Sequence, residues 1–326
     1  MLNQNKTIFV TGHKGLVGSA IHRALERRGC HKILTASRDE LDLTNQAAVN
    51  AFMETHRPDL VFAAAGRVGG ILANSQEPAQ FIYENTLIAS NLIHSAHQSG
   101  VRKLLYLGSS CIYPKKAEQP IRESALLSGS LEATNQWYAI AKIAGIKMCQ
   151  AYRQQYGCDF IAAMPTNLYG PGDHYDPERS HVLPALLQKF SEARRLQLPT
   201  VHCWGSGRPR REFLYVDDLA DACLKLMECY SGEEIVNIGY GSDVSILELT
   251  TMVQEIVGYT GQIDWDRSKP DGTYRKLLDS RKMRDLGWEP KVGLREGMVR
   301  AYEDFLNRYP SERQPEFERS ADTTLA

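Results

Sequence analysis

The chain has 326 residues and a mass of 36.6 kDa, with 38 basic and 39 acidic side chains and 43% hydrophobic residues. This length predicts about two domains with a sizeable core, and a net charge of −1 provides no overall field to attract nucleic acid or an anionic membrane. The apolar stretches are far shorter than the ~20 residues of a membrane span, and residues 1–6 are too polar to begin a secretory signal.

The cysteines indicate the compartment. There are seven, an odd number, and none forms a Cys-X-X-Cys pair, a pattern that favours reduced thiols and a cytoplasmic protein. Because no cluster of side chains has metal-ligand spacing, we expect no metal.

Short apolar runs alternate with helical patterns along the first half of the chain. Strands are expected at residues 7–11, 32–36, 60–65, 103–108 and 159–164, with helices at 17–28, 46–56, 78–99 and 137–156. This alternation is typical of an α/β fold with a doubly wound parallel, Rossmann-like sheet. Such sheets bind ligands beyond the carboxyl ends of their strands.

After about residue 164 the alternation gives way to turns, helices and short strands such as residues 235–238. We predict a Rossmann domain from residues 1–165 with a returning segment at about 212–240. A smaller C-terminal α/β substrate domain is expected from residues 166–211 and 241–310. The polar residues 311–326 are expected to form a disordered tail.

A GxxGxxG pattern formed by Gly12, Gly15 and Gly18 follows the first strand and precedes an amphipathic helix. Glycines at these positions let backbone N–H groups approach a pyrophosphate, and the helix N-terminus adds partial positive charge. The loop therefore predicts a dinucleotide cofactor.

The end of the second strand indicates which dinucleotide. Folds selective for NAD place an Asp or Glu there, whereas this chain has Arg38, which suits a 2′-phosphate, and Lys14 adds a second charge. We therefore expect NADP(H) in preference to NAD(H); the alternative is that Arg38 is an ordinary surface arginine. Asp42 is either an adenine contact or a loop cap.

Tyr138 and Lys142 form a YxxxK pattern in a predicted helix, where the i, i+4 spacing places both on one face. A phenol is a weak proton donor near neutral pH unless a neighbouring ammonium stabilises its phenolate. Ser109, at the end of the preceding strand, has a hydroxyl that could bond the same carbonyl oxygen. Taken alone, YxxxK also fits an ordinary surface helix.

The glycine loop, Ser109 and the YxxxK pair, in this order, resemble the short-chain dehydrogenase/reductase superfamily in its extended, sugar-nucleotide-modifying branch. Further segments resemble the GDP-L-fucose synthase family across nearly the whole chain: GHKG at 12–15, VGGI at 68–71, GSSCIYP at 108–114, PTNLYGP at 165–171, SHVLPAL at 180–186, WGSG at 204–207, REF at 211–213 and KPDGT at 269–273. That family epimerises C3 and C5 of GDP-4-keto-6-deoxy-D-mannose and reduces C4 with NADPH.

The resemblance implies that Cys111 is the base and His181 the acid of the epimerisation. The chemistry requires such a pair, because C3 and C5 flank the C4 ketone and inversion needs a base on one face and an acid on the other. The enolate oxygen needs donors, a role suited to Ser109 and Tyr138. The alternatives are a buried structural thiol for Cys111 and a helix-start residue for His181.

The resemblance also implies the remaining contacts. The cofactor would be bound by Gly12, His13, Lys14, Gly15, Leu16, Val17, Gly18, Arg38, Asp39, Leu107, Gly108, Ser109, Ser110, Tyr138, Lys142, Pro165, Thr166, Asn167, Leu168 and His181. The substrate would be bound by Asn167, Lys189, Trp204, Arg211 and Asp271, with the two cations suited to a diphosphate. Surface charge, aromatic packing and loop capping are the alternatives for these five.

Three activities remain open at this point. The first is the bifunctional NADPH-dependent epimerase/reductase; the second is an enzyme for a related GDP-4-keto sugar such as a heptose, or one that performs a single step. The third is a catalytically inactive NADP-binding regulator, which the presence of Ser109, Tyr138 and Lys142 disfavours. The resemblance further implies a homodimer formed through the helices at residues 78–99 and 137–156.

Overall fold

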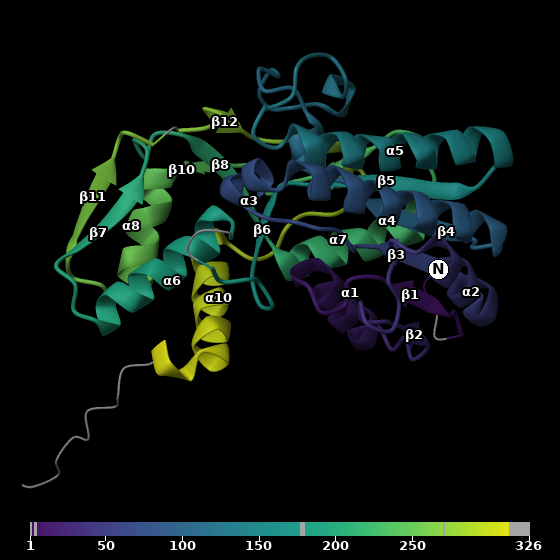
Figure 1. Ribbon diagram of the computed structural model, residues 1–326, viewed down its shortest axis with the longest axis horizontal. Helices are drawn as coiled ribbons and strands as arrows, with labels where there is room; N and C mark the ends of the chain where they lie inside the picture. The colour runs from purple at the N-terminus through teal and green to yellow at the C-terminus, as the bar shows by residue number, and fades with distance from the viewer. Residues whose placement is uncertain (1, 3–4, 177–179, 270, 313–326) are drawn as a thin grey trace, which may run out of the picture.

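A six-stranded parallel sheet organises the N-terminal part of the molecule, with the strand order β2-β1-β3-β4-β5-β9 (Figure 1). A computed structural model of the chain describes residues 2, 5–176, 180–269 and 271–312. The sheet and its helices run β1 (Ile8–Val10), α1 (Leu16–Arg27), β2 (Ile33–Leu34), α2 (Gln46–His56), β3 (Leu60–Ala63), α3 (Ile71–Gln76), α4 (Pro78–Gln98), β4 (Lys103–Leu107), α5 (Gln136–Tyr156), β5 (Asp159–Pro165), α7 (Val216–Cys229) and β9 (Val236–Ile238).

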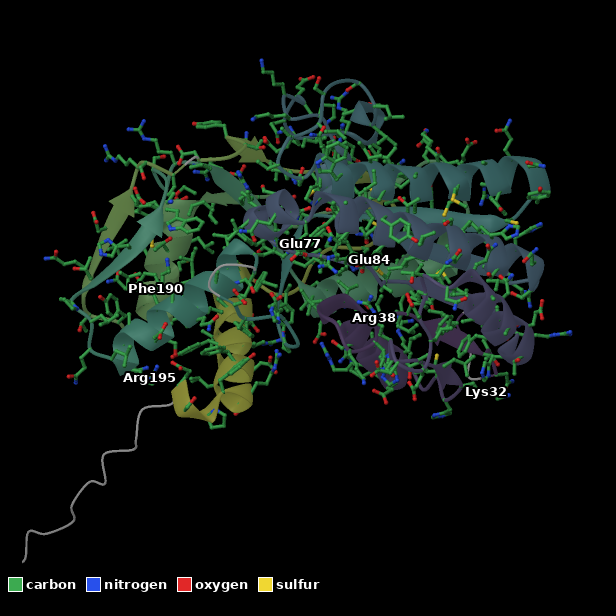
Figure 2. The ribbon with its side chains drawn as sticks, in the orientation of Figure 1. Lys32, Arg38, Glu77, Glu84, Phe190 and Arg195 are labelled. Carbon is green, nitrogen blue, oxygen red and sulfur yellow. The ribbon has the colours of Figure 1, made fainter. Side chains whose placement is uncertain are left out.

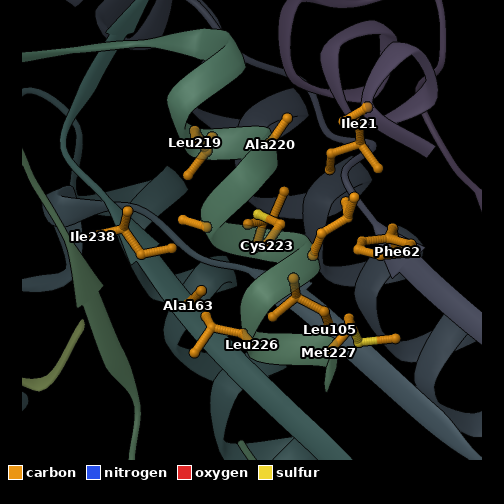
Figure 3. Packing of buried hydrophobic residues seen from close by; sticks show 14 of the residues in the cluster. Ile21, Phe62, Leu105, Ala163, Leu219, Ala220, Cys223, Leu226, Met227 and Ile238 are labelled. Atoms are coloured by element: carbon orange, nitrogen blue, oxygen red, sulfur yellow. The ribbon is translucent and has the colours of Figure 1, made fainter. Parts of the chain in front are cut away.

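Both faces of this sheet are covered, as alternating side chains along the strands require. Ile8 and Val10 of β1 pack on one side with α1 and α7, where Ile21, Leu219 and Cys223 complete the cluster drawn in Figure 3. Phe9, between the two β1 residues, joins a second cluster on the opposite side with residues of α2, α4 and α5. The sheet is therefore doubly wound.

The order of strands places the ligand site. β1 pairs with β2 on one side and with β3 on the other, so the chain changes direction across the sheet between β1 and β3. Loops diverge at such a switch point and leave a crevice beyond the carboxyl ends of the strands. The glycine loop, which joins β1 to α1, lies at this point.

Nine further elements of the described chain form a smaller α/β unit: β6 (Asn167–Tyr169), α6 (Val182–Arg195), β7 (Thr200–Trp204), β8 (Arg210–Tyr215), β10 (Asp243–Ser245), α8 (Ile246–Val257), β11 (Gln262–Asp266), β12 (Arg275–Lys276) and α10 (Leu294–Arg308). The short α9 (Arg281–Asp285) instead packs near β9, and its Met283 joins the cluster of α1 and α7. β8 pairs with β10, β12 and β6, while β11 pairs with β7. Phe190, Phe213 and Phe305 are central to a third buried cluster beneath these strands.

Local sequence explains where several helices begin and end. Gly157 follows α5 with a φ of +70°, a left-handed conformation that ends helices and favours glycine. Ser245 and Glu248 form a capping box at the start of α8, in which each side chain bonds the backbone N–H of the other. Pro78 occupies the first turn of α4, where its missing N–H removes no helical bond.

The predicted fold class is confirmed, and each of the five strands expected in the first half is present in the parallel sheet. The structure adds α3 immediately before α4, and β2 is only two residues long. β8 belongs to the smaller sheet, whereas the following α7 and β9 join the large sheet; the predicted domain boundaries stay a prediction.

Residues 311 and 312 end a short 3₁₀ turn, and the rest of the predicted tail, residues 313–326, lies outside the described residues. Among the described helices, none has the length and apolar character needed to span a membrane.

Candidate active site

The backbone of the glycine loop packs so closely on neighbouring backbone that side chains would not fit at Gly12 and Gly18. Gly12 has a φ of +68°, and a Cβ there would lie 3.0 Å from the Cα of Ala65. A Cβ on Gly18 would lie 2.2 Å from the Gly12 carbonyl oxygen. Gly15 is the N-cap of α1 and has no side chain to bond the first-turn N–H groups, so these donors are available to a pyrophosphate.

Polar side chains gather where the second strand ends. The Ser37 N–H and hydroxyl both donate to the Glu40 carboxylate, at 2.7 and 2.8 Å, and the charge of Lys14 acts on this carboxylate. Arg38 is 73% exposed and its guanidinium lies 3.7 Å from the Glu84 carboxylate of α4, which also accepts a hydrogen bond from Arg67 (Figure 2). The predicted cations for a 2′-phosphate therefore face carboxylates in this structure.

Ser109 and Tyr138 meet beyond the carboxyl end of β4. Ser109 is the second residue after β4, and Tyr138 is the third residue of α5. Burial raises the pKa of Tyr138, the nearby Cys111 raises it further, and a hydrogen bond with the Ser109 hydroxyl acts in the opposite direction. The structure thus brings together two hydroxyl groups that a carbonyl oxygen could accept from.

Lys142 lies one helical turn after Tyr138 and is buried. Its ammonium donates to the Leu107 carbonyl oxygen at 2.8 Å and lies 5.7 Å from the centroid of the Tyr138 ring. Burial lowers the pKa of Lys142 to about 8. The predicted stabilisation of the phenolate by this ammonium is not seen in the protein alone, because Lys142 is bonded to the backbone.

Cys111 lies in a 3₁₀ turn, Ser110–Ile112, that continues from Ser109. Its sulfur accepts from the Asn135 amide at 3.2 Å and from the Lys276 ammonium at 3.6 Å. Two donors from different segments of the chain therefore converge on this sulfur. The thiol is half-buried, so it is neither sealed in the core nor free on the surface.

His181 is the N-cap residue of α6 and makes no side-chain cap bond. Part of the residue's surface is exposed to solvent. Many protein atoms nevertheless lie around the imidazole, and this desolvation lowers its pKa. The charge of Lys276 lowers that pKa further. Lys276 therefore acts on both members of the predicted acid/base pair.

The predicted substrate residues divide into two groups. Arg211 is close to Cys111: burial lowers the pKa of Arg211, while the nearby Cys111 and Glu132 act in the opposite direction. Asn167, on the neighbouring β6, donates its amide to the Glu212 carbonyl oxygen at 2.8 Å. Both therefore belong to the part of the site that contains Cys111.

The second group lies around β7. The Asp271 carboxylate accepts from the N–H and hydroxyl of Ser206, at 2.6 and 2.7 Å, and so caps the turn after β7. Trp204 is 55% exposed, with the Lys269 ammonium 5.5 Å from its ring centroid. Lys189 donates to the His202 carbonyl oxygen at 2.8 Å. The exposed Trp204 ring offers a stacking surface, whereas Asp271 already has partners.

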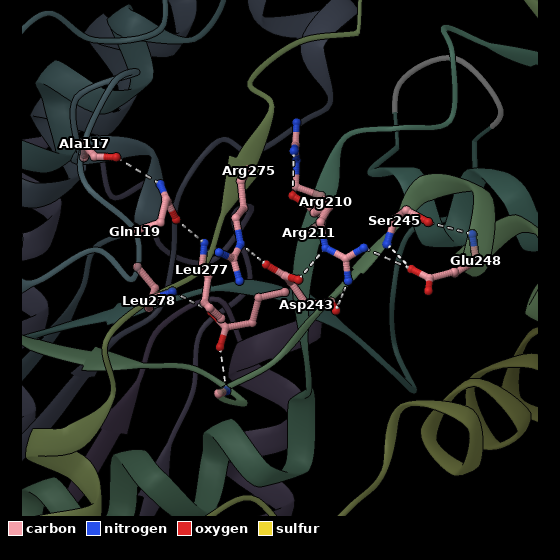
Figure 4. A network of polar contacts seen from close by, with 12 residues as sticks. Ala117, Gln119, Arg210, Arg211, Asp243, Ser245, Glu248, Arg275, Leu277 and Leu278 are labelled. Atoms are coloured by element: carbon pink, nitrogen blue, oxygen red, sulfur yellow. Dashed lines mark hydrogen bonds and ion pairs between the residues drawn. The ribbon is translucent and has the colours of Figure 1, made fainter.

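Sequence reasoning missed Lys276, Asn135 and Glu132. Lys276 is held in place by strand pairing, since β12 lies beside β8 and Lys276 is opposite Arg211. Asp243 of β10 accepts from both Arg210 of β8 and Arg275 of β12, which links the three strands (Figure 4). Two features of the sequence could have indicated these residues: Asn135 lies just before the YxxxK pattern, and Lys276 lies just after the KPDGT segment.

Glu212 of β8 binds the backbone of two neighbouring segments and so holds them beside the strand. Its buried carboxylate accepts from the N–H groups of Gly241 and Leu278, at 2.7 and 3.0 Å, and burial raises its pKa. Among the described residues, no group of three or more His, Cys, Asp or Glu side chains could hold a metal ion.

A parallel sheet with a glycine loop at its switch point, followed by Ser109, Tyr138 and Lys142 on β4 and α5, defines an oxidoreductase that uses a dinucleotide cofactor. In agreement, residues 8–239 match the NAD dependent epimerase/dehydratase family. The chain belongs to this family, within its GDP-L-fucose synthase branch.

Three known proteins illustrate this membership. GDP-L-fucose synthase 1 of Arabidopsis thaliana is 57% identical over 94% of this chain and 95% of its own length. A GDP-6-OMe-4-keto-L-xylo-heptose reductase from C. jejuni has a TM-score of 0.89 at 36% identity, covering 94% of this chain and 99% of that chain. A GDP-L-fucose synthetase from Naegleria fowleri bound to NADP has a TM-score of 0.87 at 27% identity, covering 96% and 97%.

Proposed function

We propose that this protein converts GDP-4-keto-6-deoxy-D-mannose to GDP-L-fucose, epimerising C3 and C5 and then reducing the C4 ketone with NADPH. The observation that carries the proposal is that the hydroxyl pair Ser109 and Tyr138 lies beside the predicted acid/base pair Cys111 and His181. The Ser109 and Tyr138 hydroxyls are suited to the C4 oxygen, and Cys111, which lies two residues after Ser109, shares the Lys276 charge with His181.

NADP(H) fits the residues present. The glycine loop packs tightly on neighbouring backbone at Gly12 and Gly18, and the N-terminus of α1 offers N–H donors that no side chain caps. Lys14, Ser37 and Arg38 supply donors and positive charge for a 2′-phosphate. When bound, NADPH supplies the hydride that reduces C4.

In the epimerisation, the C4 carbonyl accepts hydrogen bonds from Ser109 and Tyr138, which stabilise the negative charge that develops on its oxygen. Cys111 removes the proton from the carbon next to the ketone, and His181 returns a proton on the opposite face. One base and one acid serve both carbons in turn, because C3 and C5 flank the same carbonyl.

Two neighbours prepare Cys111 for this role. The Asn135 amide and the Lys276 ammonium donate to its sulfur, and thiolate is the form that accepts a proton. Arg211 provides a further positive charge nearby. The same cations suit the diphosphate of the substrate.

In the reduction, Tyr138 gives its proton to the C4 oxygen. Its raised pKa keeps the phenol protonated before the step, and the buried Lys142 ammonium is close enough to compensate the phenolate that forms. Lys142 must exchange its bond to the Leu107 carbonyl for this purpose or act through a cofactor hydroxyl.

The heptose alternative is supported less well than GDP-L-fucose synthesis. The C. jejuni reductase is 36% identical to this chain, against 57% for the Arabidopsis synthase. Cys111 and His181 are both present and have chemical partners, as a bifunctional enzyme requires.

We further propose a cytoplasmic homodimer. α4 and α5 pack side by side and carry exposed large apolar side chains, namely Tyr83, Trp137, Ile140 and Tyr156, which pairing of two copies would cover. All seven cysteines are free thiols, as expected in a reducing compartment. Light scattering after gel filtration measures the oligomeric state.

The decisive experiment mixes purified protein with NADPH and GDP-4-keto-6-deoxy-D-mannose, follows nicotinamide absorbance and identifies the sugar by NMR. GDP-L-fucose is the expected product. A C4-reduced sugar without inversion would remove the roles of Cys111 and His181 and leave a reductase. No consumption of NADPH would direct the assay to GDP-keto heptoses.

A further inference from the structure

Glu40 occupies an unusual place beside the cofactor loop. Its carboxylate accepts from both the N–H and the hydroxyl of Ser37, at 2.7 and 2.8 Å. These two donors and the charges of Lys14 and His13 converge on one exposed anion. The hydrogen bonds from Ser37 are the main reason that the pKa of Glu40 is lowered, so the side chain is a carboxylate at neutral pH.

The donors that Glu40 takes are those that a cofactor phosphate needs. Ser37 and Arg38 lie in the loop just after β2, near where the 2′ position of the adenine ribose lies in folds of this kind. Lys14 comes from the glycine loop, and His13 beside it reaches toward the backbone of Ala36. A 2′-phosphate arriving here meets a negative charge that already holds two of its donors.

The same carboxylate would favour a cofactor that lacks the phosphate. An acidic side chain at the end of the second strand accepts a hydrogen bond from a ribose 2′-hydroxyl, the contact typical of NAD-selective folds. Glu40 thus disfavours one cofactor and favours the other through a single interaction.

We propose that Glu40 is a selectivity residue, whose carboxylate competes with the 2′-phosphate for the Ser37 donors and accepts the 2′-hydroxyl of NADH. This inference rests on the assignment of NADP(H) to the site. Arg38 and Lys14 make the protein prefer NADPH, and Glu40 limits that preference. Removal of its charge therefore sharpens the discrimination between the two cofactors.

The competing explanation is that Glu40 only closes the turn at residues 37–40. Glu40→Gln separates the two, because glutamine keeps an oxygen that accepts from the Ser37 N–H while the negative charge is lost. If Glu40 only shapes the turn, both cofactors respond alike. If it competes with the phosphate, they respond in opposite directions.

The test is calorimetric titration of wild type and Glu40→Gln with 2′,5′-ADP and with NADH, so that no turnover is needed. We expect Glu40→Gln to bind 2′,5′-ADP about threefold or more tightly and NADH about threefold or more weakly. Equal shifts for the two ligands, or no shift, would overturn the inference. In a Ser37→Ala background the gain for 2′,5′-ADP should shrink, because the hydroxyl is lost while the contested backbone N–H remains; an undiminished gain there also contradicts the inference.

Asp42→Asn is the matched control. Asp42 bonds the N–H and hydroxyl of Thr44, at 2.9 and 2.8 Å, so this variant removes the same charge from the same loop without touching Ser37. A general field effect would appear in both variants and count against Glu40. If wild type fails to bind 2′,5′-ADP at all, the NADP(H) assignment falls as well, whereas normal wild-type binding with unchanged selectivity in Glu40→Gln overturns this inference alone.

Discussion

The Lys276 ammonium lies 3.6 Å from the sulfur of Cys111, and its charge also acts on the imidazole of His181. A single cation thus influences the two groups assigned to proton transfer. It donates to the sulfur of Cys111 and, together with burial, lowers the pKa of the His181 imidazole, which favours the neutral ring.

Lys276→Met should slow the exchange of the C3 and C5 protons with D₂O by roughly 10- to 100-fold, because the thiolate loses its charged donor. Binding of NADPH should change little. Proton NMR in D₂O measures the exchange, and the rate of iodoacetamide labelling reports the thiolate directly. Lys291→Met is the control, since Lys291 pairs with Asp221 on the surface; exchange at the wild-type rate in Lys276→Met would remove the lysine from the mechanism.

Tyr138→Phe should reduce NADPH oxidation by roughly 10² to 10⁴-fold, the usual contribution of a general acid. Ser109 still donates to the carbonyl oxygen, so some C3 and C5 exchange should continue. Absorbance of NADPH measures the reduction, and NMR on the same sample measures the C3 and C5 exchange. Retention of full reductase activity would show that the C4 oxygen takes its proton from another group.

Cys111→Ser should block product formation at the epimerisation stage while NADPH binding is kept, because a serine hydroxyl is a much weaker base than a thiolate. The accumulated sugar, identified by NMR, should retain the configuration of the substrate at C3 and C5. A fully active Cys111→Ser enzyme would assign the thiol a structural role.

Lys142→Met should abolish reduction but stabilise the fold at pH 7. Burial lowers the folded-state pKa of Lys142 from 10.5 to about 8, so below pH 8 the fold carries the full cost of a buried ammonium. That cost is relieved as pH rises from 8 toward 10.5, when the folded protein releases its proton before the unfolded chain does. We expect a gain of up to roughly 3 kcal/mol at pH 7 that shrinks by pH 10.

Thermal unfolding at the two pH values measures this gain. Lys147→Met provides the comparison on the same helix, since Lys147 is exposed and bonds Gln150. A Lys142→Met protein that is less stable at pH 7, or a difference that does not depend on pH, would contradict the expectation.

Gly18→Ala should destabilise the protein by about 2–4 kcal/mol, because the new Cβ would lie 2.2 Å from the Gly12 carbonyl oxygen and the loop must move. Gly15→Ala should cost less than about 1 kcal/mol, since its Cβ would lie at 3.4 Å from the same atom. Both changes should weaken NADPH binding by filling the space near the pyrophosphate. Chemical denaturation separates the effects; equal stabilities of the two variants would refute this account of Gly18.

The sequence alone predicts the parallel sheet because each strand is a short apolar run followed by a segment with helical periodicity. Both patterns depend only on residues that are neighbours in the sequence. The pairing of Tyr138 with Lys142 is predictable for the same reason, since it depends on helical spacing. The roles of Cys111 and His181, by contrast, came from resemblance, because neither periodicity nor spacing shows which groups surround these two residues.

Lys276 was not predictable in this way. It reaches Cys111 across 165 positions of sequence, from a strand of two residues that forms only beside β8. Neither periodicity nor composition marks so short an element. Asp271 shows the opposite case: a residue expected at the ligand is bonded to Ser206, 65 positions earlier in the chain, a long-range contact that the local sequence does not show.

The passage of the chain from β8 into α7 limits how the enzyme can be divided. Tyr215 ends a strand of the smaller sheet and Val216 begins the helix that packs on α1, so no linker separates the two halves. A fragment ending at residue 165 would lack both α7 and β9, and with them Leu219 and Cys223, so the residues of β1 and α1 that pack against these two would be exposed (Figure 3). For protein engineering, the cofactor half is therefore not a transplantable module: it must be exchanged together with residues 216–238, as a discontinuous graft.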